Sequence, residues 1–261
     1  DKMFVSDRRR RTEMEENMSK NILEIKHYTK IYSDNKKAVD DLNITVKSGE
    51  IHAFIGHNGA GKTTTIRAVV GVMDFEQGEI LIDSHSIKKE PVLCKSLTAY
   101  IPDNPDLYEY ITGIQYLNYI CDMFGVSEIE RTSGIQKYAE LFKITDSLGD
   151  LISSYSHGMK QKLALIGAFI HKPKLFVFDE PFVGLDPEAS FNLKSIMKEA
   201  CQNGSAIFFS THVLEVAEKL CDTVSIINSG KLIASGTMEE IKGQHSLEDV
   251  FMEVVENGKE I

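Results

Sequence analysis

Short apolar runs recur along the chain and are separated by polar stretches. Residues 23–26 and 42–47 alternate apolar and polar side chains, which is typical of half-exposed strands. Further short, mainly apolar runs predict strands at 51–55, 79–83, 97–101, 175–178, 206–209 and 224–227. Helical segments are expected at 64–70, 188–202 and 213–220. This alternation of strand and helix predicts a mainly parallel sheet with right-handed crossovers.

The stretch between the strands at 97–101 and 175–178 has a different period. Apolar residues at 114, 117, 121 and 124 repeat at helical spacing, and others at 135, 138, 141 and 142 mark a second helix. Thr112 and Gln115 form a capping-box pair before the first helix, and Gly125 can end it. We therefore expect residues 104–160 to form an all-helical subdomain inserted between two strands.

The eight residues from Gly56 to Thr63 read Gly-His-Asn-Gly-Ala-Gly-Lys-Thr. They match the loop G-x-x-x-x-G-K-[ST], whose backbone N–H groups wrap a nucleotide's phosphates. Lys62 would reach the β- and γ-phosphates, and the Thr63 hydroxyl would bind Mg²⁺. The predicted strand before the loop and the predicted helix after it are the context that this motif requires, which disfavours an incidental glycine turn.

A second apolar run, at 175–178, ends in the carboxylates Asp179 and Glu180. Ligands bind at the carboxyl ends of strands in open α/β sheets, so Asp179 would lie beside the phosphate loop. There it would hold Mg²⁺ through a water, and Glu180 would orient or deprotonate the attacking water. Without the phosphate loop upstream, the same residues would be interpreted as a solvated acidic turn.

The paired carboxylates favour ATP hydrolysis over GTP binding, and no Asn-Lys-x-Asp base-reading segment is present. Adenine would then be held by stacking on an aromatic ring. Tyr32, upstream of the glycine loop, is the candidate; by itself it would equally suit a strand edge.

Bulk composition limits the classes of function. The chain has 261 residues, 42% hydrophobic residues and a net charge of −10, which argues against broad nucleic-acid binding. Its four cysteines contain no C-x-x-C pair and predict a reducing compartment. Residues 1–17 carry four consecutive arginines and little apolar content. We interpret them as a tag or disordered leader, the alternative being a basic contact to lipid or nucleic acid.

Together these residues resemble the nucleotide-binding subunit of ATP-binding cassette (ABC) transporters, from about Ile22 to Val255. Residues 56–64 resemble that family's Walker A loop, and 175–180 its Walker B strand. The resemblance implies a P-loop NTPase core with a mixed, mainly parallel sheet, an antiparallel β edge and an inserted helical subdomain. It implies nucleotide contacts from Tyr32, Gly56, Asn58, Gly59, Ala60, Gly61, Lys62, Thr63 and Thr64.

The family's other motifs follow in order. Ser156, His157, Gly158 and Met159 resemble the signature segment that contacts the ATP held by the opposite subunit, so the resemblance implies a homodimer or heterodimer of cassettes. Asp186 resembles the D-loop residue at the dimer contact. His212 resembles the switch histidine that touches the γ-phosphate, so catalysis would depend on Glu180, His212 and Lys62. Outside this context Ser156 would be only a helix cap, and His212 and Asp186 structural residues.

Several positions depart from the family's pattern. The first, third and fifth signature positions are Tyr155, His157 and Met159 rather than Leu, Gly and Gln. Asp103 stands where the family has the Q-loop glutamine, and Asn104 follows it. Asp103 is expected as a third Mg²⁺ ligand beside Thr63 and Asp179, with Asn104 as a substitute for it, or else as a residue that only turns the chain.

The expected organisation has four parts. Residues 18–103 and 161–240 form the nucleotide-binding core, 104–160 the helical signature subdomain, and 241–261 a short helical tail. The tail's Ser-Leu-Glu-Asp-Val-Phe stretch resembles the short-tailed exporter-type subgroup, and is also consistent with a plain amphipathic packing helix.

The function expected from this resemblance is that of an ATPase with ATP and Mg²⁺ as cofactors. It would power export of lipid, peptide or drug-like cargo through a transmembrane permease subunit, at the cytoplasmic face of the membrane. An importer ATPase is an alternative that the sequence does not separate. A soluble ABC protein acting on DNA or ribosomes would call for tandem cassettes, coiled-coil insertions or basic patches, and a small-molecule kinase would leave the signature segment without a role.

Overall fold

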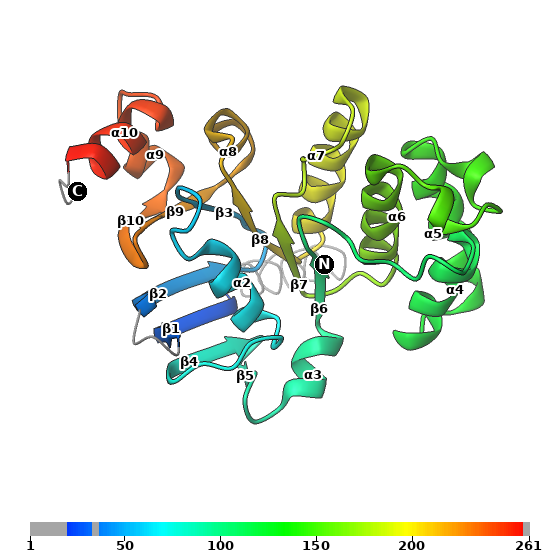
Figure 1. The fold of residues 1–261 in the computed structure, drawn as a ribbon, viewed down its shortest axis with the longest axis horizontal. Helices are drawn as coiled ribbons and strands as arrows, with labels where there is room; N and C mark the ends of the chain where they lie inside the picture. The colour runs from blue at the N-terminus through cyan, green and yellow to red at the C-terminus, as the bar shows by residue number, and fades with distance from the viewer. Residues whose placement is uncertain (1–19, 33–36, 258–261) are drawn as a thin grey trace, which may run out of the picture.

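The computed structural model describes residues 20–32 and 37–257, with side chains placed up to residue 255. The leader expected at 1–17 and the last four residues of the expected tail lie outside this range. Figure 1 shows two sheets side by side, with a helical part at one end. No helix within the described residues is both long enough and apolar enough to span a bilayer.

The larger sheet has six strands in the order β10-β9-β3-β8-β7-β6. Its strands are β3 (Ile51–Ile55), β6 (Thr98–Ile101), β7 (Leu175–Asp179), β8 (Ala206–Thr211), β9 (Thr223–Asn228) and β10 (Lys231–Thr237). All neighbours are parallel except β9 and β10. The carboxyl ends of the five parallel strands therefore meet at one edge, which is where α/β proteins place ligands.

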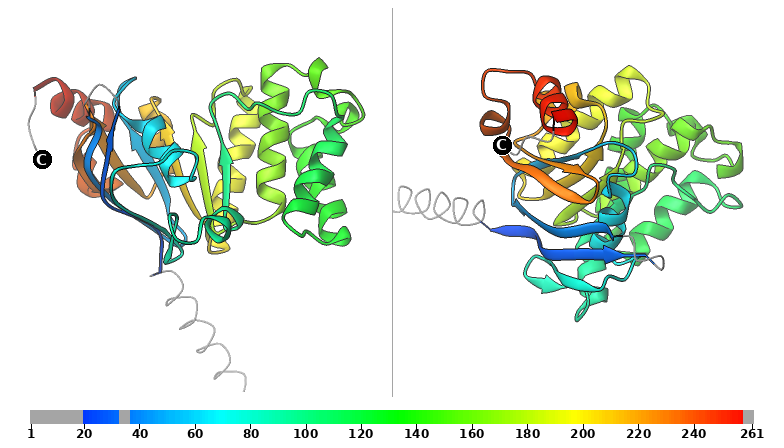
Figure 2. Two further views of the ribbon diagram at one scale, coloured as in Figure 1. Left: turned by 60° about the horizontal axis from the view of Figure 1, so that its bottom comes forward. Right: turned by 60° about the vertical axis from the view of Figure 1, so that its left-hand side comes forward.

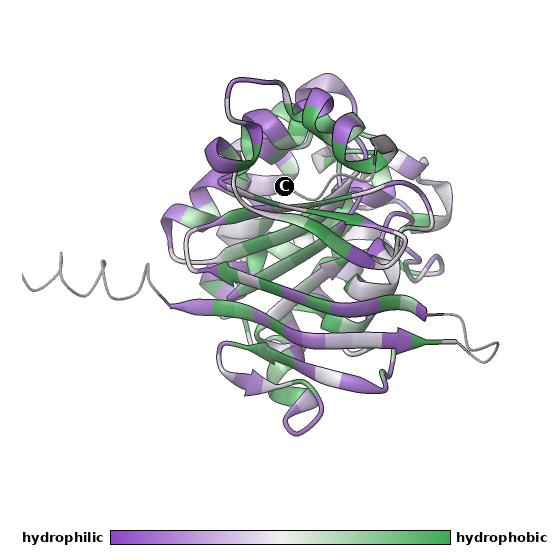
Figure 3. Ribbon diagram, turned by 90° about the vertical axis from the view of Figure 1, so that its left-hand side faces the viewer, coloured by the Kyte–Doolittle hydropathy of each residue, from purple (hydrophilic) through white to green (hydrophobic). Residues whose placement is uncertain are grey.

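The smaller sheet is antiparallel, in the order β2-β1-β4-β5. It consists of β1 (Asn21–Ile31), β2 (Lys37–Lys47), β4 (Gln77–Ile82) and β5 (His85–Ser86). Figure 3 shows hydrophilic and hydrophobic positions mixed along these strands. The alternation found in the sequence thus reflects a sheet with one face on the core and one face toward solvent. The prediction of a mixed, mainly parallel fold with antiparallel strands is confirmed.

Six helices of the described chain flank these sheets, five of them in contact with strands and α10 packed on α8 and α9. They are α2 (Lys62–Val69), α3 (Pro91–Ser96), α7 (Pro187–Gln202), α8 (Leu214–Leu220), α9 (Met238–Lys242) and α10 (Leu247–Asn257). Helix α2 packs against β2 and β7, between the two sheets, whereas α7 and α8 pack against β3 from the other side. The three helices expected from the sequence here are α2, α7 and α8.

The helical part contains α4 (Gly113–Met123), α5 (Glu128–Leu141) and α6 (His157–Ile170), with short 3-10 turns at Thr145–Ser147 and Ile152–Ser154 between α5 and α6. Figure 2 shows these helices beside β6 and β7 rather than between the sheets. Thr112 and Gln115 form the predicted capping box. Helix α6 continues ten residues beyond residue 160 and packs on β6, so it joins the proposed helical subdomain to the sheet.

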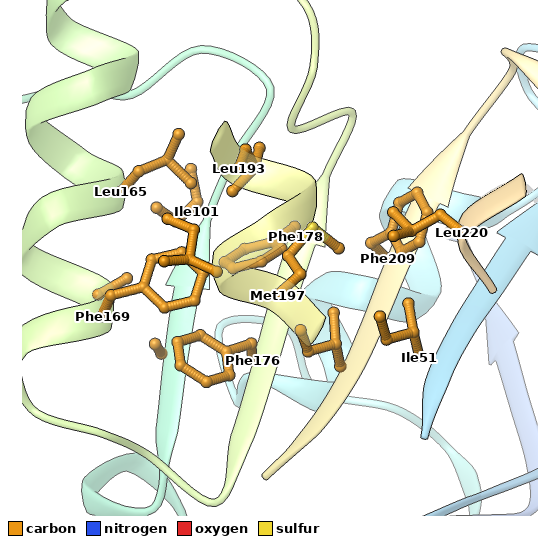
Figure 4. Packing of buried hydrophobic residues seen from close by; sticks show 14 of the residues in the cluster. Ile51, Ile101, Leu165, Phe169, Phe176, Phe178, Leu193, Met197, Phe209 and Leu220 are labelled. Atoms are coloured by element: carbon orange, nitrogen blue, oxygen red, sulfur yellow. The ribbon is translucent and has the colours of Figure 1, made fainter. Parts of the chain in front are cut away.

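Alternate residues of the central strands point into two different cores. Phe176 and Phe178 of β7 lie in the core under α6 and α7, whereas Val177 lies in the core that contains α2. The rings of Phe169 on α6 and Phe176 have centroids 4.7 Å apart (Figure 4). Burying each such ring stabilises the fold by about 1.5–3 kcal/mol. This double packing fixes the strand ends that carry the candidate site.

Candidate nucleotide site

The glycine loop connects β3 to α2, as its motif requires. Gly61 has a φ of 111°, and a Cβ there would lie 2.8 Å from the carbonyl oxygen of Ala38. Only glycine therefore fits where the loop enters the helix. The Lys62 ammonium donates to the carbonyls of Gly56 (2.7 Å) and His57 (3.1 Å) across the loop. The loop is thereby closed around its own lysine.

Lys62 is a buried cation whose pKa burial lowers, while the carboxylates of Glu180 and Asp179 oppose that shift. These two neighbours favour the charged ammonium. A charged lysine in a loop of this motif is suited to bind polyphosphate.

Asp179, the last residue of β7, is 2% exposed. Its Oδ2 accepts a hydrogen bond from the Thr63 hydroxyl at 2.8 Å, and its Oδ1 accepts one from Ser210 on β8. A carboxylate and a hydroxyl at this separation offer oxygen ligands of the kind that Mg²⁺ prefers, with the remaining positions left to water and phosphate. The donor set therefore fits the metal that the sequence predicts.

Glu180 follows in a left-handed backbone conformation, with a φ of 50°. Its N–H donates to the carbonyl and the hydroxyl oxygens of Ser210, both at 3.2 Å. A non-glycine residue in this conformation is costly and persists where its surroundings impose it, which is common at functional sites. The conformation turns the Glu180 side chain toward His212, whose Nδ1 lies 2.9 Å from Glu180 Oε1.

One cavity of about 550 Å³ collects most of the predicted nucleotide and metal residues. Its lining comprises Tyr32, Lys37, Ala38, Asn58, Gly59, Gly61, Lys62, Thr63, Thr64, Asp103, Asp179, Glu180 and Ser229. Gly56 and Ala60 are buried and do not line it. His212 lines a smaller neighbouring cavity and reaches this one through Glu180.

Three lining residues were not predicted. Lys37 and Ala38 begin β2, and Ser229 lies in the turn between β9 and β10. No motif predicts them, because the overall fold, and not the local sequence, brings these residues close to the phosphate loop. Of the three, Lys37 is the one that its positive charge and its position just after Tyr32 could have indicated.

Tyr32 and Asp103 stand on the cavity wall. The Tyr32 hydroxyl lies 3.3 Å from the Thr64 hydroxyl, and the residue is 42% exposed, so its side chain is open to contact with a base. Asp103 is exposed, and its Oδ1 accepts from the N–H of Asn104 at 2.9 Å. Asp103 thus turns the chain and also faces the cavity.

The predicted signature residues do not line the nucleotide cavity of their own chain. Ser156 caps α6 by accepting from the N–H of Met159, at 3.3 Å. A Cβ on Gly158 would lie 2.6 Å from the carbonyl oxygen of Gly184, so this segment packs directly against the turn before Asp186. Asp186 caps α7 and pairs with Lys162 at 2.7 Å, and that hydrogen bond lowers the pKa of Asp186.

Tyr155, at the first signature position, is a packing residue of the helical part. It is buried, and its hydroxyl donates to the carbonyl of Ser147 at 2.5 Å. A Cβ on Gly113 would lie 2.3 Å from this hydroxyl, so the tyrosine fits because residue 113 is glycine. The departure from leucine therefore has a local steric partner.

The fold and the loop define a P-loop nucleotide-binding protein. The family model for ABC transporters matches residues 39–183. Together with relatives that are more than 30% identical over most of the chain, this match means that the chain belongs to the ABC transporter family, as an ATP-binding subunit with ATPase activity. The resemblance inferred from the sequence is confirmed.

Three known proteins illustrate the similarity. The ABC-type transporter ATP-binding protein EcsA of Bacillus subtilis (strain 168) is 34% identical over 89% of this chain and 94% of its own length. The linearmycin resistance ATP-binding protein LnrL of the same organism is 30% identical over 84% and 70%, respectively. A solved ATP-binding subunit of an ABC transporter is 35% identical, with a TM-score of 0.86 over 89% of this chain and 99% of its own.

Proposed function

We propose that the 550 Å³ cavity binds and hydrolyses ATP with Mg²⁺. The observation that carries this proposal is the convergence of Lys62, Asp179 and Glu180 on one cavity, with His212 held by Glu180. The N–H groups of the loop and Lys62 bind the β- and γ-phosphates, and Tyr32 stacks on adenine. Ser229 and Lys37 border the same space.

Hydrolysis needs an oriented water and stabilisation of charge on the transferred phosphoryl group. Glu180 accepts a proton from that water. His212, which is held by the Glu180 carboxylate, reaches the γ-phosphate and stabilises its developing charge. Thr63, Asp179 and Asp103 hold Mg²⁺, which offsets phosphate charge when bound.

Two copies are proposed to face each other, so that the signature segment Ser156–Met159 of one chain completes the site of the other. Ser156 caps α6, and a helix N-terminus favours an anion. Asp186, on the turn packed against Gly158, lies where it can contact the partner's loop. This chain contains both halves of such a site, so a homodimer suffices; a second, different cassette is the alternative.

A membrane subunit is proposed to dock on a groove of about 370 Å³ between the sheet and the helical part. Its lining includes Pro102 and Leu107, which follow β6, and Tyr116 and Met123 of α4. The groove is lined by Pro102, and the next residue, Asp103, lines the nucleotide cavity, so movement of a docked helix would reach that cavity. We further propose export of lipid, peptide or drug-like cargo from the cytoplasmic face, a direction consistent with the resistance function named for LnrL.

The membrane partner can be tested by crosslinking. The four native cysteines are all buried. A thiol at the half-exposed Met123 (Met123→Cys) is therefore expected to crosslink, in native membranes, to a protein that copurifies and stimulates ATP hydrolysis. Phe191→Cys, exposed on α7 and outside the groove, is the matched control. Equal crosslinking from both sites would contradict docking at the groove.

The site itself is tested by Lys62→Ala. We expect at least a tenfold loss of ATP affinity, measured with a fluorescent ATP analogue, because the variant removes the cation that binds the phosphates. Wild-type affinity would contradict the assignment of the cavity.

A further inference from the structure

The C-terminal helix α10 touches the phosphate loop. The rings of Phe251 on α10 and His57 in the loop have centroids 5.0 Å apart and meet edge to face, at 63°. Such aromatic contacts are directional as well as apolar. The expected tail is therefore in contact with the nucleotide site, although its sequence is far from it.

Helix α10 is firmly held. Ser246 and Asp249 cap its start through reciprocal hydrogen bonds, and the N–H of Leu247 donates to Glu218 of α8 at 3.0 Å. Leu247, Phe251 and Val254 are buried in the main core. Phe251, one turn after Leu247, is consequently fixed in space before it meets His57.

His57 is well placed to transmit this contact. Its carbonyl oxygen accepts from the Lys62 ammonium and from the N–H of Ala60, both at 3.1 Å. His57, Asn58 and Gly59 are exposed, so this arc of the loop has solvent on its outer side. A shift of residue 57 would move the lysine that binds the phosphates.

The same contact reaches the switch histidine. A cavity of about 160 Å³ is lined by Phe251, His57 and His212, together with Gly56, Asn58 and Leu214. Leu214 is the first residue of α8, on which α10 packs. One side chain of the tail thus borders both the phosphate loop and the segment that carries His212.

We infer that Phe251 is a positioning residue for the ATPase reaction: through His57 it holds the phosphate loop in its binding conformation. The inference rests on the proposed nucleotide site. It assigns the C-terminal helix a part in ATP binding rather than in packing alone.

The test is a KM-against-kcat comparison in the full chain. An aromatic pair contributes about 0.5–1.5 kcal/mol beyond its buried area, which corresponds to about two- to tenfold in affinity. Phe251→Ala is therefore expected to raise the KM for ATP about two- to tenfold, with kcat changed less than about twofold. Phe251→Tyr keeps the ring and is expected to restore the wild-type KM. Should the alanine variant fail to fold, Phe251→Leu fills most of the volume without the ring and is expected to raise KM in the same direction.

Val254→Ala is the matched control, because it truncates another buried side chain of the same helix. It is expected to lower the thermal midpoint as Phe251→Ala does, with an unchanged KM. A double-mutant cycle with His57→Ala adds a second readout: the effects on KM are expected not to multiply, since both variants remove one contact. Equal KM changes for Val254→Ala and Phe251→Ala, or independent effects in the cycle, would overturn the inference.

Lys62→Ala in the same assay distinguishes a failure of the Phe251 inference from a failure of the proposed nucleotide site. Loss of affinity in Lys62→Ala together with a normal KM in Phe251→Ala would refute the role of Phe251 alone. Wild-type affinity in Lys62→Ala would refute the nucleotide site, and with it the inference.

Discussion

Glu180 and His212 form one unit at the carboxyl edge of the sheet. The imidazole Nδ1 lies 2.9 Å from one carboxylate oxygen, and the backbone N–H of His212 lies 3.4 Å from the other. The Glu180 side chain is 15% exposed and the His212 side chain 59% exposed. The partly buried carboxylate therefore orients the exposed imidazole. The proposed roles of Glu180 and His212 in hydrolysis depend on each other for this reason.

Glu180→Gln is expected to bind ATP within a few-fold of wild type and to lower kcat by about 10²–10⁴, because the amide cannot take the water's proton. Single-turnover hydrolysis and equilibrium binding separate the two effects. His212→Ala is expected to lower kcat with a smaller change in affinity. Unchanged turnover in Glu180→Gln would remove Glu180 as the base.

Asp103→Gln is expected to retain or raise Mg²⁺-dependent hydrolysis if position 103 ligates the metal, since an amide oxygen replaces a carboxylate oxygen. Activity is measured over a Mg²⁺ titration, with Asp103→Ala as the comparison. If every substitution at 103 left the Mg²⁺ dependence unchanged, the residue would only turn the chain, as its bond to the Asn104 N–H allows.

Gly158→Ala is expected to reduce ATP turnover at least tenfold while leaving the affinity of the isolated chain for ATP unchanged. The added Cβ would lie 2.6 Å from the Gly184 carbonyl and so push the signature segment away from the D-loop turn. Steady-state kinetics and nucleotide binding are compared. Gly149→Ala, where a Cβ meets nothing within 4 Å, is the control and is expected to behave as wild type. A fully active Gly158→Ala would contradict a role of this segment in turnover.

The buried His52 is expected to make the fold less stable in acid. It is buried between the hydroxyls of Thr223 (2.8 Å) and Ser225 (2.9 Å), and burial lowers its pKa to about 3. In the unfolded chain the pKa of His52 is about 6.5, so the unfolded chain binds a proton more readily than the folded chain does. Above about pH 6.5 both states hold a neutral His52, and the fold has its full stability. This stability falls as the pH drops from about 6.5 toward 3, by about 2 kcal/mol at pH 5.

Urea unfolding at pH 7.5 and pH 5.0 measures this loss. His52→Gln removes the titrating group and keeps a polar side chain between the two hydroxyls. The free energy of unfolding of the variant is therefore expected to change less between these pH values than that of the wild type. Equal acid sensitivity in both proteins would contradict the buried neutral histidine.

The sequence predicted the elements that are specified by motifs of neighbouring residues. The glycine loop, the strand ending in Asp179 and the capping box at Thr112 were all read from adjacent residues, and the structure contains each of them. The ABC family and the mixed, mainly parallel fold were predicted as well.

Other features depend on contacts between distant parts of the chain. Strand β10 lacks a clear period, and helices α3 and α9 are only six and five residues long; all three form because neighbouring elements pack against them. Ser229 reaches the cavity through a turn, and Phe251 reaches His57 through the packing of α10 on α8. No spacing in the sequence indicates that residues 57 and 251 meet.

We propose that ATP is held between two copies of the cassette. Sedimentation of the Glu180→Gln variant, which should bind ATP without cleaving it, tests this most directly. At saturating ATP and Mg²⁺ we expect twice the mass of one chain, reverting to a single chain when nucleotide is removed or when Ser156→Arg is added to block the signature segment. A single chain carrying bound ATP at every protein concentration would contradict the account.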